Sequence, residues 1–499
     1  MKNRTVFVIG TGVSGLVAGI YVRLAGLDVE MFEAHSIVGG NCTGWNRQGF
    51  HIDGCIQWLT GTRPGTGVHD IWRTCRALGD DVSVYNTEKI ASTVYEGKMY
   101  HLYSDLNRME CELLDISPGD KAAICKLIKD IRRFQHLNAP IDKPFEQANP
   151  LIFLPLIWKL IRSGKPDRKT EFMTINDYLR EFESPVIRQL LSCVFPVVLP
   201  AYTLFYSLGI RTSGDGGWPV GGSLEFVKRM QRYFEYLGGK IHLGKTVDKI
   251  IVRDGKAAGI RLKGEDRELT ADYIISAVDA DMLLNRLLEA RYPDKFFEKR
   301  FTESHNYMIL TGTYVGLGVS ADIGSYPHNI YIQPEKPLRI NKTELSFFNV
   351  KVYNFDPKFV RDGKTVMTVL LTENEFDFWK SLKENSIREY NSEKERIAKW
   401  VTGGIVKVFP ELEGKIEMSD VATPLTFNKY CNSYRGTYMS FIPYGSVKKQ
   451  FHKGRIDGVK NLYVAGQCTF PAGGLPLAAI SGKFAAQRLL SAERENDKK

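Results

Sequence analysis

The chain has 499 residues, of which 43% are hydrophobic, and its 67 Lys and Arg against 57 Asp and Glu give a formal charge of +10. This composition excludes a disordered, fibrous or disulfide-scaffold protein. At ~100–200 residues per domain, the length predicts about two to four folding units and leaves room for an enclosed pocket. The basic residues are spread along the chain rather than gathered in long blocks, so we expect no nucleic-acid partner.

The cysteines lie far apart in the sequence and form no CxxC pair. They also lack the neighbouring His residues of a zinc site, so we expect no metal. Free and mostly buried thiols are typical of a reducing compartment, which predicts a cytoplasmic protein. The eight cysteines are Cys42, Cys55, Cys75, Cys111, Cys125, Cys193, Cys431 and Cys468.

The first predicted elements are a strand and a helix between Thr5 and Ala25. The apolar run Val6–Ile9 is too short for the core of a signal peptide and leads directly into glycines, so it predicts a strand. The following Gly10-Thr11-Gly12-Val13-Ser14-Gly15 matches G-x-G-x-x-G at the mouth of the helix. These glycines allow a tight turn, the approach of a pyrophosphate and close packing of helix on strand, while the helix N-terminus offers free N–H groups to the anion.

A second strand, predicted over Asp28–Phe32, leads into Glu33. Glu33 follows Gly15 by 18 positions, close to the ~20 at which an acidic residue accepts hydrogen bonds from ribose hydroxyls. The motif therefore predicts a dinucleotide site, but it does not choose between NAD and FAD.

An apolar segment, Leu151–Ile161, raises the question of a membrane. It is too short to span a bilayer, and four basic residues follow it, namely Arg162, Lys165, Arg168 and Lys169. The segment is either a stretch that dips into a membrane interface, where anionic lipid attracts the basic residues, or an ordinary core helix with a solvated end.

A longer apolar segment, Leu190–Ile210, has 21 residues without a charge. Pro196 and Pro200 interrupt its backbone hydrogen bonding, so we expect a buried, kinked wall of an apolar cavity rather than a transmembrane helix. The aromatic residues expected to line that cavity are Phe195, Tyr202, Phe205 and Tyr206.

The middle of the chain changes from helix–strand patterning to successive strands. Ser223–Leu237 predicts a helix with Ser223 as its N-cap, and Lys240–Leu243 predicts the strand after it. Strand-like runs follow at Thr311–Leu317, Asn329–Ile332 and Val366–Leu371. We therefore expect parallel α/β pieces with a more antiparallel insertion between them.

A second glycine-rich loop stands near the other end of the chain. Asn461–Gln467 predicts a buried strand, and Pro471–Gly482 predicts a loop leading into a helix. Pro476 fits the first turn of that helix, where a missing N–H costs nothing. Two helix starts that favour anions, one near each end of the chain, suit a long ligand such as FAD.

Several motifs together resemble one family. They are Glu33-x5-Gly39-Gly40, Gly49–Gly54, Gly217–Gly222, Thr423–Phe427 and Gly466–Gly482. In these the chain is similar to the FAD-dependent carotenoid desaturases and carotenoid isomerases, including the retinol saturases, a phytoene dehydrogenase-like group. The resemblance covers nearly the whole chain.

The resemblance implies an α/β fold of two parts. One is a discontinuous Rossmann-type FAD-binding domain, over residues 1–105, 211–300 and 445–499. The other is an inserted α+β domain with a mainly antiparallel sheet, over residues 106–210 and 301–444, which binds substrate and associates with the membrane.

The resemblance also implies which residues hold the cofactor. The glycine-rich turn would bind the pyrophosphate, Glu33 the ribose, and the backbone of Val247 the adenine. Asn41 and Gln467 stand where relatives more often have Arg and an acidic residue, so only backbone roles are implied for them. The expected set is Gly10, Gly12, Val13, Ser14, Gly15, Glu33, Ala34, Gly40, Asn41, Cys42, Val247, Gly466, Gln467, Leu475, Pro476 and Leu477.

The implied activity is that of an FAD-dependent oxidoreductase, a flavoprotein that desaturates, saturates or isomerises carbon–carbon bonds. Its substrate would be a long, hydrophobic, isoprenoid or carotenoid-like small molecule, and the protein would be cytoplasmic and peripherally attached to a membrane surface. The alternatives are an FAD-dependent amine oxidase-like enzyme and a non-catalytic lipid-binding protein of the same fold.

The catalytic residues stay open at this point, as do the electron donor or acceptor and the direction of reaction. Adding or removing hydrogen across a carbon–carbon bond moves a proton as well as a hydride. His51, Asp53, Tyr202 and Asp215 are positionally possible proton carriers, although a structural role is the better explanation for each of them. No nucleophile elbow, P-loop or HExxH motif is present in the sequence.

Overall fold

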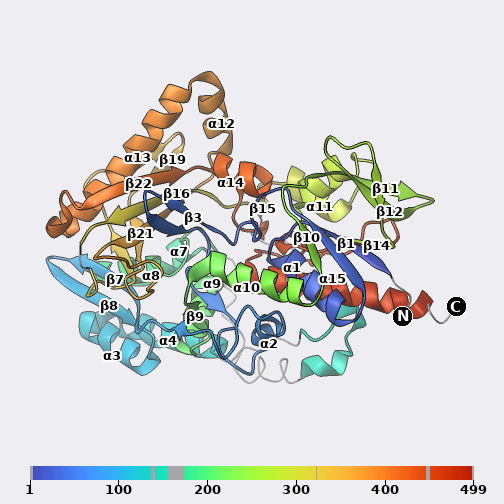
Figure 1. Cartoon of the computed structure of the whole chain (residues 1–499). Helices are drawn as coiled ribbons and strands as arrows, with labels where there is room; N and C mark the ends of the chain where they lie inside the picture. Colours follow the sequence, from blue (N-terminus) through green and yellow to red (C-terminus); the bar gives the residue numbers. More distant parts are fainter. Residues whose placement is uncertain (1–3, 136–140, 155–172, 322, 445–449, 497–499) are drawn as a thin grey trace.

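The computed structural model describes residues 4–135, 141–154, 173–321, 323–444 and 450–496 of the chain. Two large sheets lie in different parts of the molecule (Figure 1), a five-stranded parallel sheet and a seven-stranded mixed sheet. The parallel sheet collects strands from both ends of the chain and from its middle, so the two parts of the fold interleave in sequence.

The five-stranded sheet has the order β10-β2-β1-β14-β24, with every neighbouring pair parallel. On β1, Val6 and Val8 pack in the core shared with α1 and α15, whereas Phe7 and Ile9 pack in the core shared with β11 and β12. Burial on both faces explains why the strand is apolar without alternation. The strands are β1 (Thr5–Ile9), β2 (Asp28–Phe32), β10 (Lys240–His242), β14 (Tyr273–Ser276) and β24 (Leu462–Val464).

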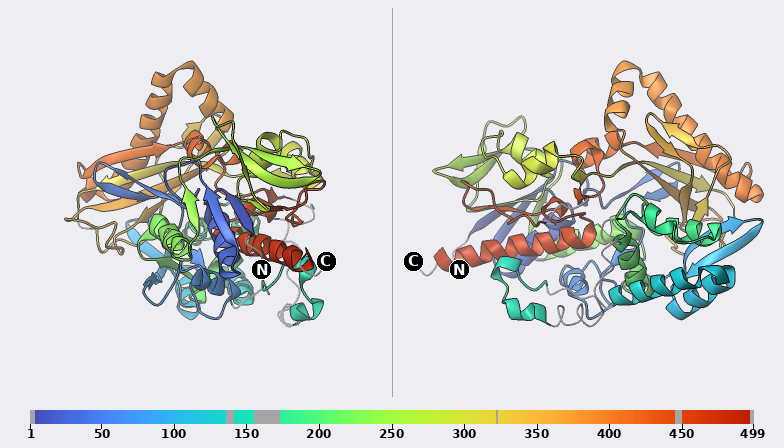
Figure 2. Two further views of the ribbon diagram at one scale, coloured as in Figure 1. Left: turned by 45° about the vertical axis from the view of Figure 1, so that its right-hand side comes forward. Right: turned by 180° about the vertical axis from the view of Figure 1, so that it is seen from behind.

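Two helices from opposite ends of the chain pack together on one face of this sheet. α1 (Val13–Leu24) and α15 (Leu475–Asn496) lie side by side. The rear view in Figure 2 shows the long α15, in red, running along this part of the molecule. Gly482 permits this approach, because a Cβ there would lie 2.3 Å from the carbonyl oxygen of Ser14. The other elements around the sheet are α2 (Gly67–Thr74), α10 (Gly222–Tyr236), α11 (Lys295–Thr302) and an antiparallel layer of β11 (Val247–Arg253), β12 (Lys256–Leu262) and β13 (Glu268–Thr270).

The seven-stranded sheet has the order β22-β16-β21-β20-β17-β7-β8 and is antiparallel except where β17 meets β7. On β20, Phe348, Val350 and Val352 pack under α12 (Phe376–Asn385) and α13 (Ile387–Val408), the helices that project at the top of Figure 1. The strands are β7 (Lys89–Tyr95), β8 (Lys98–Tyr103), β16 (Thr311–Val319), β17 (Asn329–Ile332), β20 (Phe348–Val352), β21 (Thr365–Glu373) and β22 (Ile416–Ala422).

The other side of the seven-stranded sheet meets a group of helices that share one core with β7 and β8. These helices are α3 (Leu106–Ile116), α4 (Lys121–Phe134), α7 (Ile175–Leu179), α8 (Pro185–Ser192) and α9 (Ala201–Thr212). Strands β7 and β8 thus belong to the same sheet as the strands of residues 301–444, whereas the division drawn from the sequence put them in the 1–105 part.

The elements predicted from local patterning are present. β2 and β17 have the predicted bounds, and β16 and β21 extend the predicted runs by a few residues. The predicted N-cap is wrong, because Gly221, at φ +102, precedes the first turn of α10. Ser223 lies inside that helix, and its hydroxyl donates a hydrogen bond to Asp53 instead.

The segment Leu190–Ile210 is kinked as predicted. α8 ends at Ser192, and α9 begins at Ala201 directly after Pro200. No helix in the described ranges is long and apolar enough to cross a membrane. Of the other apolar segment, the part after residue 154 and the basic residues that follow it lie outside the described residues.

All eight cysteines are free thiols. Cys42, Cys75, Cys193 and Cys468 are buried, whereas Cys111 and Cys125 are exposed.

Candidate cofactor and substrate site

A cavity of about 1410 Å³ is lined from both sheets. It is larger than the ~300–1,000 Å³ of a pocket for one drug-sized ligand. Its walls include the carboxyl ends of β1, β2 and β14, the N-terminal ends of α1 and α15, and parts of α9 and β20. Ligands of open α/β sheets bind outside the carboxyl ends of the strands. The cavity therefore includes the ligand-binding edge of the parallel sheet and continues from it to α9 and β20.

The glycine-rich turn after β1 opens on this cavity. Gly10 has φ +92, a conformation that favours glycine. A Cβ on Gly12 would meet only the Gly39 carbonyl oxygen, at 3.9 Å, whereas a Cβ on Gly15 would lie 2.0 Å from the carbonyl oxygen of Gly10. Gly12 is the N-cap of α1 and supplies no side-chain cap, so the helix N-terminus presents its N–H groups to the cavity.

Glu33 follows β2 and also lines the cavity. Its Oε2 accepts hydrogen bonds from the backbone N–H of Thr11, at 2.9 Å, and from the Thr11 hydroxyl, at 2.7 Å. Its Oε1 accepts from the N–H of His35 at 2.9 Å. The carboxylate therefore ties the end of β2 to the glycine-rich turn while it faces the cavity.

The loop before α15 forms another part of the wall. The backbone N–H of Gly466 donates to Ser481 Oγ at 2.8 Å, and Gln467 Oε1 accepts from the N–H of Gly474 at 2.8 Å. Pro476 is the second residue of α15, which is the first-turn position predicted for it.

The expected cofactor residues come together around this one cavity, apart from Gly15, which packs against Gly10 instead. Asn41 donates through Nδ2 to the carbonyl of Thr437 at 3.3 Å, and its buried Oδ1 has no partner among the described residues. The residues of the expected set that line the cavity are Gly10, Gly12, Val13, Ser14, Glu33, Ala34, Gly40, Asn41, Cys42, Val247, Gly466, Gln467, Leu475, Pro476 and Leu477.

The kinked segment forms an apolar wall, as predicted. Phe195, Tyr202 and Tyr206 line the cavity. Phe205 does not, because it turns into the helical core and packs edge-on against Tyr178, with ring centroids 5.1 Å apart. On α9, residues four apart share a face, so Tyr202 and Tyr206 meet the cavity together while Phe205 points away.

A comparison with known protein families identifies the chain. The family model described as flavin containing amine oxidoreductase matches residues 13–490. The chain belongs to this family. It is an FAD-dependent oxidoreductase.

Curated relatives of this flavoenzyme match it over nearly its whole length. It is 25% identical to all-trans-retinol 13,14-reductase of Danio rerio, over 97% of this chain and 86% of the relative. It is also 25% identical to the chloroplastic prolycopene isomerase of Daucus carota, over 97% and 79%. A 4,4'-diapophytoene desaturase of a Methylomonas species is 24% identical, over 98% and 96%.

Among solved structures, cyclohexylamine oxidase from Brevibacterium oxydans has a TM-score of 0.59 at 16% identity, with 99% of this chain and 100% of that one covered. This likeness concerns the fold, a Rossmann-type FAD-binding part joined to a substrate-binding part.

The residues of the flavoenzyme fit FAD. Open space at Gly12, an uncapped helix N-terminus and the unpartnered Oδ1 of Asn41 all face the cavity. A bound dinucleotide would place its pyrophosphate at the helix N-terminus beside Gly12 and would offer a polar partner to Asn41 Oδ1.

The four candidate proton carriers divide into two pairs. Tyr202 and Asp215 line the cavity, whereas His51 and Asp53 do not. Asp215 Oδ1 accepts from the backbone N–H groups of Gly61, at 3.1 Å, and Arg63, at 2.8 Å, and burial raises the pKa of this carboxyl. His51 contacts Asn46 Oδ1 at 2.8 Å.

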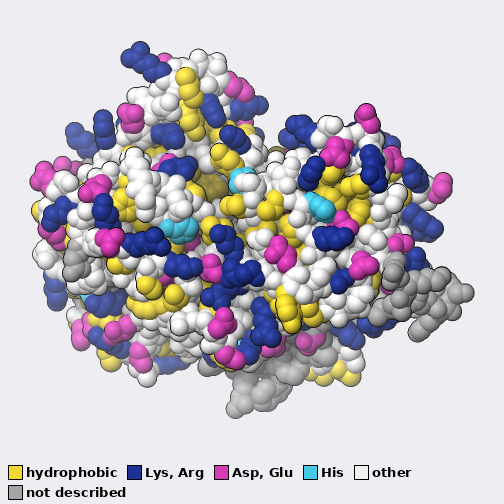
Figure 3. Space-filling model, in the orientation of Figure 1, with side chains coloured by type: hydrophobic (Ala, Val, Ile, Leu, Met, Phe, Trp, Pro, Cys, Tyr) yellow, Lys and Arg dark blue, Asp and Glu magenta, His cyan; other side chains and the backbone are white. Residues whose placement is uncertain are grey.

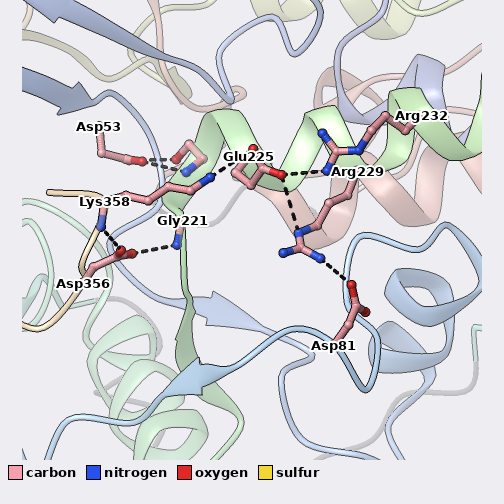
Figure 4. Close-up of polar contacts among 9 residues, drawn as sticks. Asp53, Asp81, Gly221, Glu225, Arg229, Arg232, Asp356 and Lys358 are labelled. Atoms are coloured by element: carbon pink, nitrogen blue, oxygen red, sulfur yellow. Dashed lines mark hydrogen bonds and ion pairs between the residues drawn. The ribbon is translucent and has the colours of Figure 1, made fainter.

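Asp53 has a structural position, at the start of α10 (Figure 4). It accepts from the backbone N–H of Ser223 at 2.6 Å and from its hydroxyl at 2.7 Å. Complete burial raises the pKa of Asp53 to about 6. Nearby, Asp356 Oδ2 accepts from the N–H of Gly221 at 2.7 Å, so two carboxylates from different parts of the fold fix this helix N-terminus.

Sequence reasoning missed three charged residues of the cavity wall, Asp279, Glu344 and Lys351. Asp279 follows β14 and accepts from the N–H of Tyr434 at 3.2 Å, and burial raises its pKa to about 6. Its place just after a strand of the parallel sheet could have signalled a ligand contact. Lys351 on β20 gave no signal, because its place in the wall depends on strands paired across distant parts of the chain.

Proposed function

We propose that this flavoenzyme saturates, desaturates or isomerises carbon–carbon double bonds in a long apolar substrate of the isoprenoid type. The observation that carries the proposal is one continuous cavity, which extends from the glycine-rich turn of the parallel sheet to the apolar wall of the kinked segment. The names of the matched reductase, isomerase and desaturase support the same class of substrate.

We assign the expected cofactor roles to the residues that line the cavity. The N-terminus of α1 and Gly12 would hold the pyrophosphate, Glu33 the ribose, and the backbone of Val247 the adenine. Gly466, Gln467 and the start of α15 would surround the flavin. FAD, when bound, supplies hydride transfer.

The chain's own residues would position the substrate and exclude water. Phe195, Tyr202 and Tyr206 offer the apolar and aromatic surface that a substrate with few polar groups needs. Tyr202 and Asp215 are the candidate proton carriers that reach the cavity. We divide the fold accordingly into an FAD part built on the five-stranded sheet and a substrate part built on the seven-stranded sheet.

We also propose that the protein takes its substrate from a membrane surface to which it attaches peripherally. Val198, 44% exposed, and Tyr444, 42% exposed, belong to the cavity wall and reach the surface. Leu151 and Leu154 are 64% and 54% exposed, so the apolar segment begins outside the core. On the face of the molecule that Figure 3 shows, acidic side chains are mixed among basic ones. This mixture is not the pattern of a surface that attracts anionic lipid, so we do not assign the membrane contact to this face.

Amine oxidation is the second candidate, because the matched family is described by that activity. Beside Lys351, a positive group in the cavity wall, a cationic amine is disfavoured electrostatically, so an amine would have to bind nearer to the carboxylates of the same wall, Asp215, Asp279 and Glu344.

The test is anaerobic incubation of the protein, with its FAD oxidised in one arm and reduced beforehand with dithionite in the other, with phytoene-like polyenes, retinoids, unsaturated fatty acids and amines. Flavin redox state and product mass are followed together. We expect flavin reduction, flavin reoxidation or an isomerised product with at least one polyene. Reduction by amines alone, with all polyenes unchanged, would contradict the proposal.

A further inference from the structure

One wall of the cavity carries a buried lysine. Lys351 lies on β20 and is 6% exposed, yet it lines the cavity. Within the described parts of the chain, no residue gives it a hydrogen bond or an ion pair. A buried ammonium without a counter-ion is costly, because desolvation of the charge is not repaid.

The surroundings of Lys351 increase this cost. Burial and then the positive charge of Arg211 lower the pKa of Lys351 to about 7. Arg211 comes from α9 and is 7% exposed. Its Nη2 donates to the carbonyl of Ile90 at 3.3 Å, and its Nε has no partner among the described residues.

The other titratable groups near Lys351 carry no compensating negative charge. Burial raises the pKa of Cys193, which follows α8, to about 12, and it lowers the pKa of His328, just before β17, to about 3. Both groups are therefore neutral at pH 7. Ser207, on the same helix as Arg211, also lines the cavity, and its hydroxyl has no partner within the described ranges.

We propose that Lys351 binds the carboxylate of the substrate, so that the substrate is a long unsaturated acid rather than a hydrocarbon. A carboxylate at this place neutralises the charge of the Lys351 ammonium and offsets the positive electrostatic potential of Arg211. It also accepts a charge-assisted hydrogen bond from Lys351. A hydrocarbon substrate would leave the Lys351 ammonium without any polar partner. A hydroxyl group would give it a hydrogen bond but would not neutralise its charge. The apolar chain of the acid would lie against the wall of Phe195–Leu199.

This inference rests on the proposed function, because it names the substrate class of the same cavity. Its test uses binding without turnover. FAD-loaded protein is titrated at pH 6.5 with a conjugated tetraene fatty acid, its methyl ester and the corresponding alcohol, and polyene fluorescence reports binding. We expect the acid to bind about tenfold or more tightly than the ester and the alcohol.

Three variants locate the preference. Lys351→Met keeps the length of the side chain and should bring the affinity for the acid down to that for the ester, with ester binding unchanged. Lys351→Arg should restore most of the preference. Lys380→Met, on the exposed surface of α12, is the matched control and should behave as wild type.

A pH series on the wild type tests the inference without a variant. The preference for the acid should fall as the pH rises above about 7, where free Lys351 loses its proton. Arg211, whose pKa burial lowers to about 10, keeps its charge over that interval. This series decides the matter if Lys351→Met does not accumulate as folded protein.

Equal affinity for acid and ester in the wild type would overturn the inference, as would a preference that survives in Lys351→Met. Failure of the proposed function and failure of the carboxylate site give different results. Absence of polyene turnover with the acid preference intact would contradict the reaction alone, whereas polyene turnover without that preference would contradict the carboxylate site alone.

Discussion

Glu33 has a structural role and, as we propose, also a binding role in one carboxylate. Three N–H and O–H donors, from Thr11 and His35, already use it. A carboxylate has about four lone-pair positions, so about one remains for a ribose hydroxyl. The dinucleotide motif predicts this residue type, but the hydrogen bonds to Thr11 show that the same group also shapes the glycine-rich turn.

The first prediction concerns this carboxylate. Glu33→Gln should weaken FAD binding by about tenfold, roughly 1.5 kcal/mol, because a charge-assisted acceptor becomes a neutral amide. The measurement is titration of the apoprotein with FAD, followed by flavin fluorescence. Glu30→Gln, on β2 beside His242, is the matched control and should bind FAD normally. Unchanged affinity for FAD in Glu33→Gln would show that Glu33 does not bind the cofactor.

A second prediction concerns the pH dependence of stability and depends on Asp53. Its pKa is 3.8 in the unfolded chain and about 6 in the fold. The folded protein therefore retains a proton that the unfolded chain has released, so the contribution to stability is full below about pH 4 and is lost as the pH rises through about 6. A shift of this size corresponds to about 3 kcal/mol.

Comparison with Asp53→Asn isolates this effect. Relative to the variant, the wild type should lose up to about 3 kcal/mol of unfolding free energy between about pH 4 and 7. The measurement is urea unfolding followed by tryptophan fluorescence at several pH values. Asp81→Asn, an exposed partner of Arg229, should show no such change. A difference that does not vary with pH would contradict the buried titration of Asp53.

At the scale of elements, the turn between β1 and α1 separates two kinds of glycine. Gly12 has φ −62 and open space beside it, so any side chain fits the backbone but enters the cavity. Gly15 has the backbone of Gly10 against it. The motif treats both as one signature, but only the structure assigns the first to ligand space and the second to packing.

The third prediction follows from this contrast. Gly12→Ala should fold with an unfolding free energy within about 0.5 kcal/mol of wild type, yet bind FAD at least tenfold more weakly, because the methyl group occupies ligand space. Gly15→Ala should cost about 1–3 kcal/mol of stability through overpacking. Urea unfolding of the apoproteins and FAD titration measure the two effects. Equal loss of stability in both variants would contradict the assignment.

Elements set by local sequence were predictable, and those set by distant partners were not. β2, β17 and the turn at Gly10 follow from residues close together in the chain. The pairing of β7 with β17, the turning of Phe205 into the helical core and the placing of Lys351 in the cavity wall depend on contacts between distant segments. Local periodicity carries no information on such contacts.

At the scale of the whole molecule, α10 links the two parts of the fold. Glu225 on this helix bonds to Lys358, from the loop after β20, at 3.1 Å. It also bonds to Arg232 at 2.6 Å, and Arg229 reaches Asp81 at 2.9 Å (Figure 4). Each of these exposed ion pairs contributes little to stability. The buried acceptors Asp53 and Asp356, which bind the N-terminus of α10, therefore contribute more to fixing the two parts of the fold relative to each other.

The fourth prediction concerns the membrane. Neutralising Lys159, Arg162, Lys165, Arg168 and Lys169 together should weaken binding to vesicles with anionic lipid, because each basic residue near the surface adds about 1 kcal/mol of attraction. Vesicle sedimentation at low and high salt measures this. Neutralising Lys380, Lys383, Lys394, Lys399 and Lys407 of α12 and α13 is the matched control. Unchanged vesicle binding in the first variant would mean that the basic residues only keep the protein in solution.

The packing of α1 on α15 has a consequence for biosynthesis. During translation the glycine-rich turn leaves the ribosome before the loop and helix that complete the wall around the cavity, which follow the elements between Thr5 and Val464. A nascent chain therefore has no closed compartment in which to retain the flavin until α15 has docked through Gly482. We therefore expect cofactor loading to follow the synthesis of α15, so that newly made protein turns yellow only once both sheets have folded.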